Sequence, residues 1–389
     1  MKKETTLLFG GDFVIREGFT EDDIQISTDL IKEFEQSDFN TLNLECPVTD
    51  ATSKDRIRKT GPHLKGNKQL IKKKLKELDI DLLTLANNHI LDYGSKGVLD
   101  TLDFCEGNDF YSVGAGENLF EARKSFRTTV DSKKISIINF AENEWSSAKD
   151  NSPGGNPYDL IDNLNQIKEE KNLADIVIVV IHGGHEYYNL PSPRMVKEYR
   201  FYADGGADLI VGHHPHCISG FEIYKNTPIY YSLGNFLFTS PSSYSDWYLG
   251  MILKIRIKND NSLQCELLPI KQDKSNYSIG LLEDVEYESV IANVLKYSKI
   301  INNGDLLKKE WDLYVSKKLD TYLSMFSVFN YIRNKYVKII LYKLKITKLF
   351  LNKRVLTLYL NLLRCESHLD MSKASILKLL GDEDRNSEK

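Results

Sequence analysis

Six acidic, amide or imidazole residues stand where short apolar segments of the chain end. They are Asp12, Glu45, Asn88, His182, His214 and His216. Carboxylate, amide oxygen and imidazole together are ligands that a hard or borderline divalent cation accepts. A carboxylate can bridge two cations, and two cations about 3.5–4 Å apart bind a phosphate and lower the pKa of a bound water. The set therefore predicts a divalent-metal site, with a phosphoester as its natural electrophile.

His89 differs from the other histidines because it directly follows a proposed ligand, Asn88, and Asp92 stands three residues later. A histidine beside a metal ligand suits a general acid that protonates a leaving oxygen. The nearby carboxylate would orient the ring and support its cationic form. We therefore assign His89 and Asp92 to acid catalysis.

The histidines near residue 214 are expected to divide between two faces. Alternate residues of an extended segment point the same way. His214 and His216 are therefore expected to face the metals, whereas His213 points away and packs or supports a ligand.

Three further polar residues leave two interpretations each. Asn235 contacts the site or only forms a Gly-Asn turn. Glu186 supports a ligand histidine or is a solvated charge. Lys65 lies with Lys59 and His63 in a polar loop. It could bind substrate, but an exposed charge is the favoured interpretation for this loop.

Short strands are expected to position these residues. The apolar runs that precede them are Thr5–Phe9, Phe39–Leu44, Asp81–Ala86, Ile176–Ile181, Asp208–Val211 and Pro228–Leu233. Short runs that are apolar on both faces are typical of strands buried on both sides. Segments 29–36, 67–78 and 96–105 have helical spacing, and 251–257 and 263–270 predict two more strands. Alternating strands and helices predict an α/β core, in which ligands bind at the carboxyl ends of strands.

The composition predicts a globular chain. Of 389 residues, 41% are hydrophobic and 27% charged, and the net charge of -4 gives no general affinity for polyanions. No apolar stretch approaches the ~18 residues of a membrane helix, and the start lacks the apolar segment of a signal peptide. We expect a cytoplasmic protein. The five cysteines form no CxxC pair, so reduced thiols are expected.

The signals beyond about residue 280 are mainly helical and become strongly basic. Residues 321–365 contain no Asp or Glu but nine cationic residues, so the remainder of the chain has a net charge of -13. The cations are Arg333, Lys335, Lys338, Lys343, Lys345, Lys348, Lys353, Arg354 and Arg364. One helical face carries Val337, Ile340, Leu341, Leu344 and Leu351. Packing on the acidic body is the favoured interpretation, ahead of an anionic membrane surface or a capsule synthase. No nucleic-acid partner is expected.

Five motifs, in order, resemble the capsule-synthesis CapA family. They are Asn-Leu-Glu at 43–45, Ala-Asn-Asn-His-Ile-Leu-Asp-Tyr-Gly at 86–94, His-Gly-Gly-His-Glu-Tyr at 182–187, Gly-His-His-Pro-His at 212–216 and Tyr-Ser-Leu-Gly-Asn-Phe at 231–236. That family, associated with poly-γ-glutamate capsules, belongs to the calcineurin-like metallophosphoesterases. The resemblance covers residues 5 to 275.

The resemblance implies a four-layer sandwich of two mixed sheets flanked by helices. We expect this domain over residues 1–280 and a helical appendage over 281–389. It also implies metal roles: Asp12 and His216 on the first metal, Glu45 as the bridge, and Asn88, His182 and His214 on the second. The metal is Mn, Fe, Zn or Mg.

The first motif departs from the ordinary calcineurin-like pattern, which has Asp-x-His. Val14 occupies the third position, as in the CapA group, so the first metal loses an imidazole. Arg16 stands further on, and its guanidinium could hold a phosphate or carboxylate of the substrate instead.

The expected function is a metal-dependent hydrolase, phosphoesterase-like, in capsule or surface-polymer synthesis. Its substrate would be a phosphoester or an anionic polymer. One alternative is a metal-binding partner of a polymer synthase that does not turn over substrate. Another is hydrolysis or transfer at an amide or ester of a carboxylate-rich polymer, since the same metals polarise a carbonyl.

Overall fold

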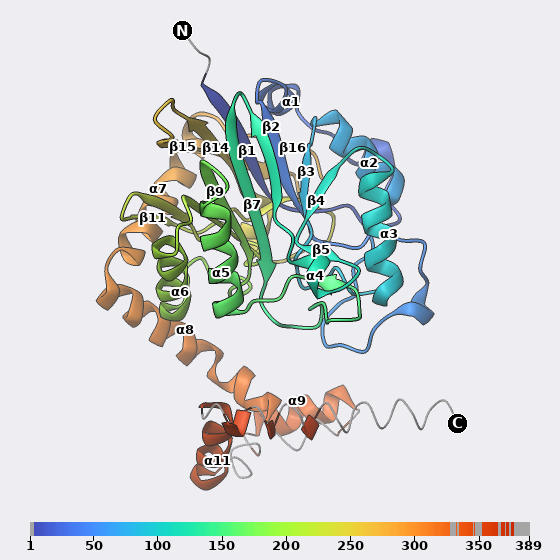
Figure 1. The fold of residues 1–389 in the computed structure, drawn as a ribbon. Helices are drawn as coiled ribbons and strands as arrows, with labels where there is room; N and C mark the ends of the chain where they lie inside the picture. Colours follow the sequence, from blue (N-terminus) through green and yellow to red (C-terminus); the bar gives the residue numbers. More distant parts are fainter. Residues whose placement is uncertain are drawn as a thin grey trace. The chain divides into compact units, whose positions relative to one another are not determined.

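The computed structural model describes residues 4–326 and, beyond them, residues 332, 334–344, 346, 352–364, 367–369, 371–372 and 375–376. The chain falls into two compact units, Met1–Lys308 and Lys309–Lys389. The larger unit is a layered α/β structure (Figure 1).

The first sheet contains the strand that carries Asp12. Its strand order is β16-β15-β14-β1-β2-β3-β4, and β13 pairs with β1. These strands are β1 (Thr5–Val14), β2 (Phe39–Leu44), β3 (Leu82–Thr84), β4 (Tyr111–Val113), β13 (Asn235–Phe238), β14 (Leu249–Ile257), β15 (Leu263–Gln272) and β16 (Ile279–Leu281). β1 to β4 are parallel, whereas β14 to β16 pair antiparallel, so the sheet is mixed.

The second sheet contains the strands that lead to the histidines. Its order is β11-β12-β10-β9-β7-β6. These strands are β6 (Phe126–Val130), β7 (Lys133–Ala141), β9 (Ile176–His182), β10 (Leu209–His213), β11 (Phe221–Tyr224) and β12 (Thr227–Tyr230). The four inner strands are parallel and the two edge strands antiparallel, so this sheet is also mixed.

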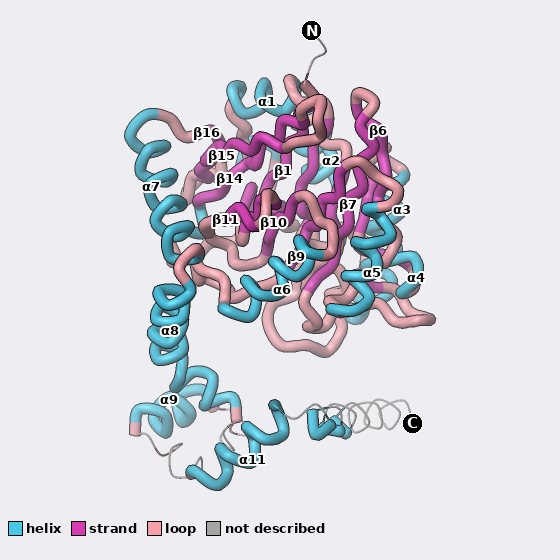
Figure 2. The backbone as a smooth tube through the Cα atoms, turned by 60° about the vertical axis from the view of Figure 1, so that its left-hand side comes forward, coloured by secondary structure: helices cyan, strands magenta, loops and turns pink. Residues whose placement is uncertain are grey.

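Helices cover the outer face of each sheet. Buried side chains of α1 (Thr28–Glu35), α2 (Lys68–Glu77) and α3 (Gly94–Glu106) pack with the first sheet. Those of α5 (Leu160–Lys171) and α6 (Pro193–Asp204) pack with the second. A third apolar cluster lies between the sheets and joins Leu7 and Phe9 of β1 to Ile178 and Val180 of β9. The predicted four-layer sandwich is confirmed, and Figure 2 shows the strands enclosed between helices.

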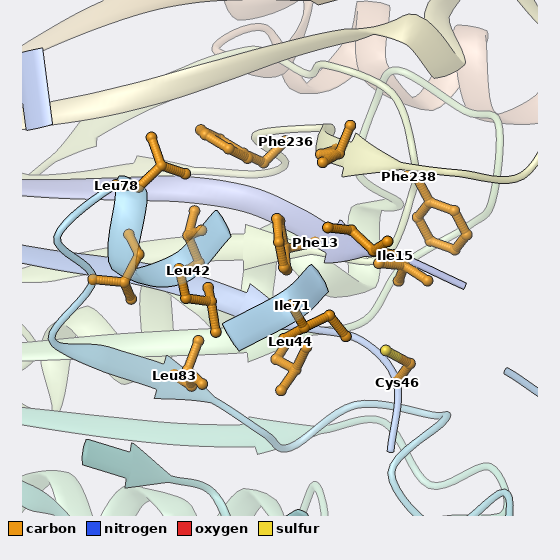
Figure 3. Packing of buried hydrophobic residues seen from close by; sticks show 14 of the residues in the cluster. Phe13, Ile15, Leu42, Leu44, Cys46, Ile71, Leu78, Leu83, Phe236 and Phe238 are labelled. Carbon is orange, nitrogen blue, oxygen red and sulfur yellow. The ribbon is translucent and has the colours of Figure 1, made fainter. Parts of the chain in front are cut away.

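The predicted helices and strands form where apolar periodicity indicated. The segments at 29–36, 67–78 and 96–105 are α1, α2 and α3, with ends shifted by at most two residues. Figure 3 shows Ile71 and Leu78, from α2 and its end, packed with Leu42, Leu44 and Leu83 of the sheet. Because these strands are covered on both faces, all of their residues are buried, including the polar residues of β2.

The expected boundary at residue 280 is not where the compact units divide. α7 (Asp284–Ile301) buries Val290 and Val294 in the cluster between the sheets, and Leu307 at the start of α8 (Gly304–Met325) is also buried. These apolar contacts keep α7 in the larger unit.

The smaller unit is helical where the structure describes it, with α9 (Lys335–Lys343) and α11 (Lys353–Arg364). Among the described helices, none is long and apolar enough to cross a membrane. Arg333, Lys345, Lys348 and Leu351, which were counted in the basic tail, lie outside the described residues.

Candidate metal centre

Strand pairing brings the proposed ligands to one edge of the sandwich. In the first sheet, Asp12 of β1 pairs with Asn43 of β2 and with Asn235 of β13. In the second sheet, His182 ends β9 and pairs with His213 at the end of β10. Because these strand ends are buried, their polar side chains meet in a dry environment.

Asp12 is held by several protein groups. Its Oδ1 accepts a hydrogen bond of 2.7 Å from Asn43 Nδ2 and lies 3.2 Å from His213 Nδ1. Its Oδ2 accepts from the backbone N–H of His214 at 3.3 Å and lies 3.4 Å from His216 Nδ1. The carboxylate is fully buried, so its orientation is fixed by these neighbours.

A second group of atoms converges on His182 Nε2. Asn88 Oδ1 lies 3.1 Å from this nitrogen, His214 Nδ1 3.2 Å, and Glu45 Oε1 3.6 Å. All four side chains are buried. The ligand atoms of Glu45, His182 and His214 all lie within 4.8 Å of one another. With the amide oxygen of Asn88 beside His182, they form a ligand set for a divalent cation.

Glu45 lies between the two groups. Its Oε1 is 3.6 Å from His182 Nε2 and also 3.6 Å from His216 Nε2. Among the described residues, neither carboxylate oxygen has a hydrogen-bond partner, although the side chain is 0% exposed. A buried charge is costly unless it is paired or coordinates a metal. The residues present therefore fit divalent cations on both sides of Glu45.

The pKa directions separate two kinds of histidine. Burial, aided by the charge of a neighbouring histidine, lowers the pKa of His182 well below its usual value and also lowers that of His214. Burial also disfavours charge on His216, but Glu45 and Asp12 outweigh it and raise the pKa of His216 to about 10. His182 and His214 are therefore neutral imidazoles at pH 7, which is the form that binds metal.

The two carboxyl groups also differ. Burial alone raises the pKa of Asp12, but the adjacent imidazoles of His213 and His216 outweigh burial and hold that pKa well below its usual value. Burial raises the pKa of Glu45 well above its usual value; His216 opposes this and Asp12 adds to it. Asp12 is therefore stabilised as a carboxylate by adjacent imidazoles, whereas the charge of His216, 3.6 Å from Glu45, does not outweigh the burial of Glu45.

The expected extended geometry after β10 is wrong. His214 has φ +97° and His216 has φ +53°, so both lie in the left-handed region that non-glycine residues seldom occupy. The chain turns sharply instead of alternating, and His213 approaches Asp12 rather than pointing away. Backbone strain of this kind concentrates at functional sites.

His89 and Asp92 form the expected pair. Since a carboxylate only accepts, His89 Nδ1–H donates to Asp92 Oδ2 at 2.7 Å. Asp92 raises the pKa of His89, as expected, but burial outweighs this effect. The pKa of His89 therefore lies below its usual value. Lys59 adds to this lowering and forms an ion pair with Asp92.

The four residues expected to contact substrate or to support the site have different surroundings. Asn235 Oδ1 accepts from His216 Nδ1 at 2.9 Å, so Asn235 belongs to the cluster. Glu186 is exposed, and its charge raises the pKa of His216. Arg16 is exposed, and its Nη1 donates to Ser240 at 3.3 Å. Lys65 pairs with Glu17 at 2.9 Å and donates to Ala51 O.

Asn43 and Lys59 were missed as site residues. Asn43 is the first residue of the Asn-Leu-Glu motif, so its place in the motif was an available signal. It joins the two ligand groups, because its Nδ2 donates to Asp12 and lies 3.3 Å from His182 Nδ1. Lys59 was expected to be an exposed charge, yet its side chain is 3% exposed. A lysine in a polar loop gives no sequence signal of burial.

Comparison with known proteins identifies relatives along most of the larger unit. Residues 6–240 match the family described as bacterial capsule synthesis protein PGA_cap. The PGA biosynthesis protein CapA of Bacillus subtilis (strain 168) is 33% identical over 289 residues, which are 74% of this chain and 75% of that protein. The capsule biosynthesis protein CapA of Bacillus anthracis is 35% identical over 244 residues, which are 61% of this chain and 56% of that protein.

Solved structures are similar at much lower identity. A putative 5'-nucleotidase from Staphylococcus aureus in complex with alpha-ketoglutarate has a TM-score of 0.45 and 15% identity, covering 76% of this chain and 58% of that one. A hypothetical protein from Thermus thermophilus has a TM-score of 0.44 and 14% identity, covering 68% of this chain and 98% of that one. We draw no functional conclusion from similarities of this extent.

Proposed function

Because the chain belongs to the bacterial capsule synthesis family PGA_cap, we propose that it is a metal-dependent, phosphoesterase-type hydrolase of capsule or surface-polymer biosynthesis. The main support is Glu45, a fully buried carboxylate without a hydrogen-bond partner among the described residues. It lies between two groups of ligand atoms, where a bridging carboxylate of a two-metal site would be needed.

Each group of ligands would hold one divalent cation. Asp12, Glu45 and His216 would hold the first, with His216 releasing its ring proton on binding. Glu45, Asn88, His182 and His214 would hold the second. Val14 is buried in the apolar core and adds no ligand, so the first cation would have fewer protein ligands and bind more weakly. When bound, such cations neutralise a phosphate and lower the pKa of a water molecule.

The protein's own groups would complete the reaction. Asp92 fixes the orientation of the His89 ring through the Nδ1–H bond. In the cationic ring Nε2 would carry the second proton, and it would give that proton to the leaving oxygen, leaving His89 as the neutral Nδ1–H tautomer that Asp92 holds. Exclusion of water around the buried ligands strengthens every electrostatic interaction with a bound phosphate.

Hydrolysis of an aryl phosphate with added Mn²⁺ tests the proposal. We expect turnover by the full chain that is lost in Glu45→Gln together with bound metal. Glu169→Gln is the matched control, since Glu169 is an exposed residue of α5, and it should leave turnover unchanged. Bound metal without turnover would favour the non-catalytic partner of a synthase. Turnover of a polymer amide or ester, but of no phosphoester, would favour the other alternative.

We also propose that the basic tail contacts an anionic membrane surface. Residues 321–365 contain no acidic residue. In α11, Leu358, Leu360 and Leu363 are about half exposed, at 55%, 56% and 53%, while Lys353 and Arg354 begin the same helix. Exposed leucines beside cations are typical of helices that lie on anionic lipid.

A further inference from the structure

A buried lysine lies beside the His89–Asp92 pair. The Lys59 side chain is 3% exposed, and its Nζ donates to Asp92 Oδ1. The same ammonium lies 3.3 Å from His89 Nδ1. Lysine is almost never buried unless it is paired. Lys59 therefore occupies a defined position in the site rather than a solvated one.

The loop that carries Lys59 is bound to the segment that carries His89 and Asp92. Ile57 N donates to the backbone carbonyl of Asp92 at 3.2 Å, and Leu64 N donates to the Asp92 side chain at 2.7 Å. Between these contacts, His63 Nε2–H donates to Ile57 O at 2.8 Å and closes the loop. Contacts before and after Lys59 thus fix where its ammonium lies.

The oxygens of Asp92 divide their partners. Oδ2 accepts hydrogen bonds from His89 Nδ1–H and from Leu64 N. Oδ1 accepts a hydrogen bond from Lys59 Nζ. Asp92 is 0% exposed, so water cannot replace a lost donor at no cost. Loss of Lys59 would leave one oxygen of a buried carboxylate unpaired and free the group to rotate.

We infer that Lys59 is a positioning residue that acts through His89. By occupying Oδ1 of Asp92 it keeps Oδ2 directed at His89 Nδ1, which fixes both the tautomer and the plane of the ring. Nothing in this role requires Lys59 to touch substrate. The inference rests on the proposed function of His89 as proton donor, and it extends that function to a residue outside the proposed metal ligands.

The first test is a double-mutant cycle on turnover in the full chain with Mn²⁺. Lys59→Met should lower kcat for a phosphate with a poor leaving group by about 10–100-fold, the usual cost of losing a group that orients another, with little change in KM. In the His89→Asn background the same change should have no further effect. Equal losses in both backgrounds, or no loss in either, would overturn the inference. Lys54→Met, at an exposed position five residues earlier in the same chain, is the matched control and should retain turnover.

The second test is independent of turnover. In ¹⁵N-labelled, metal-loaded protein, the ring N–H of His89 should give an NMR signal that disappears in His89→Asn. We expect this signal to be lost in Lys59→Met and retained in Lys59→Arg, which keeps a cation at Asp92. An unchanged signal in Lys59→Met would overturn the inference. If Lys59→Met does not fold, a ring signal unchanged in the neutral Lys59→Gln would overturn it instead. A wild-type chain without turnover, but with this pattern of signals, would overturn the proposed function and leave the role of Lys59 in place.

Discussion

The two carboxylates of the metal centre are stabilised in different ways. Asp12 accepts hydrogen bonds from Asn43 and from the backbone of His214. Glu45 has no hydrogen-bond partner among the described residues. The protein supplies hydrogen bonds to Asp12 that Glu45 does not receive, and under the proposed function a bound cation would compensate Glu45. The stability of the metal-free protein should show this difference.

Substitution of Glu45 should stabilise the metal-free protein. Glu45→Gln removes a carboxyl group whose pKa is raised well above its usual value by burial, so that keeping this group in the folded chain costs free energy at pH 7. We therefore expect the free energy of unfolding to rise, by about 1–3 kcal/mol. The same variant should lose the increase in Tm that Mn²⁺ gives the wild type. Thermal unfolding with and without metal measures both effects. Asp12→Asn is the contrast and should destabilise the metal-free chain; a metal-free Glu45→Gln that unfolds at lower temperature would refute the assignment.

Substitution of His89 should spare the metals and reduce catalysis. His89→Asn is expected to lower kcat by about 10²–10⁴-fold, the usual contribution of a positioned acid. The loss should shrink for aryl phosphates whose leaving groups need no proton. Elemental analysis checks that metal is retained, and a series of leaving groups measures the trend. Equal losses across the series would remove His89 from acid catalysis.

At the scale of elements, the sequence was informative where strands are buried on both faces. β9 is a continuous apolar run that ends in His182, and β2, buried along its whole length, is followed directly by Glu45, so the strands and the polar positions at their ends could be predicted. The pairing of β13 with β1 could not be predicted from the sequence, because the chain crosses from one sheet to the other before Asn235 reaches Asp12. The burial of Lys59 likewise depends on contacts distant in the chain.

The edge strand β6 is tied to α5 by an ion pair that should make stability depend on pH. Arg127 Nε and Nη2 donate to the two oxygens of Glu170, each at 2.7 Å, and Ser136 Oγ donates to Oε2 at 2.8 Å. Burial raises the pKa of Glu170, but these bonds outweigh burial and hold the pKa below its usual value. The pair therefore stabilises the fold above the unfolded pKa of 4.5, and this stability is lost as pH falls through the folded value.

Glu170→Gln should destabilise the protein at pH 7 by about 1.5–3 kcal/mol, the contribution of a hydrogen bond to a charged group. The difference from wild type should decrease as the pH falls below 4.5. Chemical unfolding at several pH values measures it. Glu169→Gln, at the exposed neighbouring position, should show neither effect. A difference that is constant with pH would contradict the ion-pair account.

At the scale of the whole molecule, the charge is divided along the chain. The nine cations of residues 321–365 leave a charge of -13 for the remainder. In α9, the exposed apolar side chains Tyr336, Ile339 and Ile340 accompany Lys335 and Lys343. An anionic membrane would attract this segment and repel the acidic remainder, so the tail would bind lipid and leave the metal centre accessible.

The full chain should therefore sediment with anionic vesicles at low salt and dissociate as salt rises. Changing Lys335, Lys353 and Arg354 to Gln should weaken binding by about 3 kcal/mol, at about 1 kcal/mol for each cation. The control changes three exposed lysines of the larger unit, Lys68, Lys72 and Lys258, to Gln and should bind as wild type does. No binding at low salt would favour a tail packed on protein. Equal binding to neutral vesicles would contradict the attraction between the cations and the anionic lipid.

Under the proposed function, Glu45 would be a ligand of two adjacent divalent cations. An EPR titration of the full chain with Mn²⁺ tests it most directly, because two ions about 3.5–4 Å apart are magnetically coupled. We expect the second equivalent of Mn²⁺ to produce an exchange-coupled spectrum that is absent in Glu45→Gln. A spectrum of isolated Mn²⁺ at every ratio, or a coupled spectrum that survives in Glu45→Gln, would contradict the two-metal centre proposed for this chain.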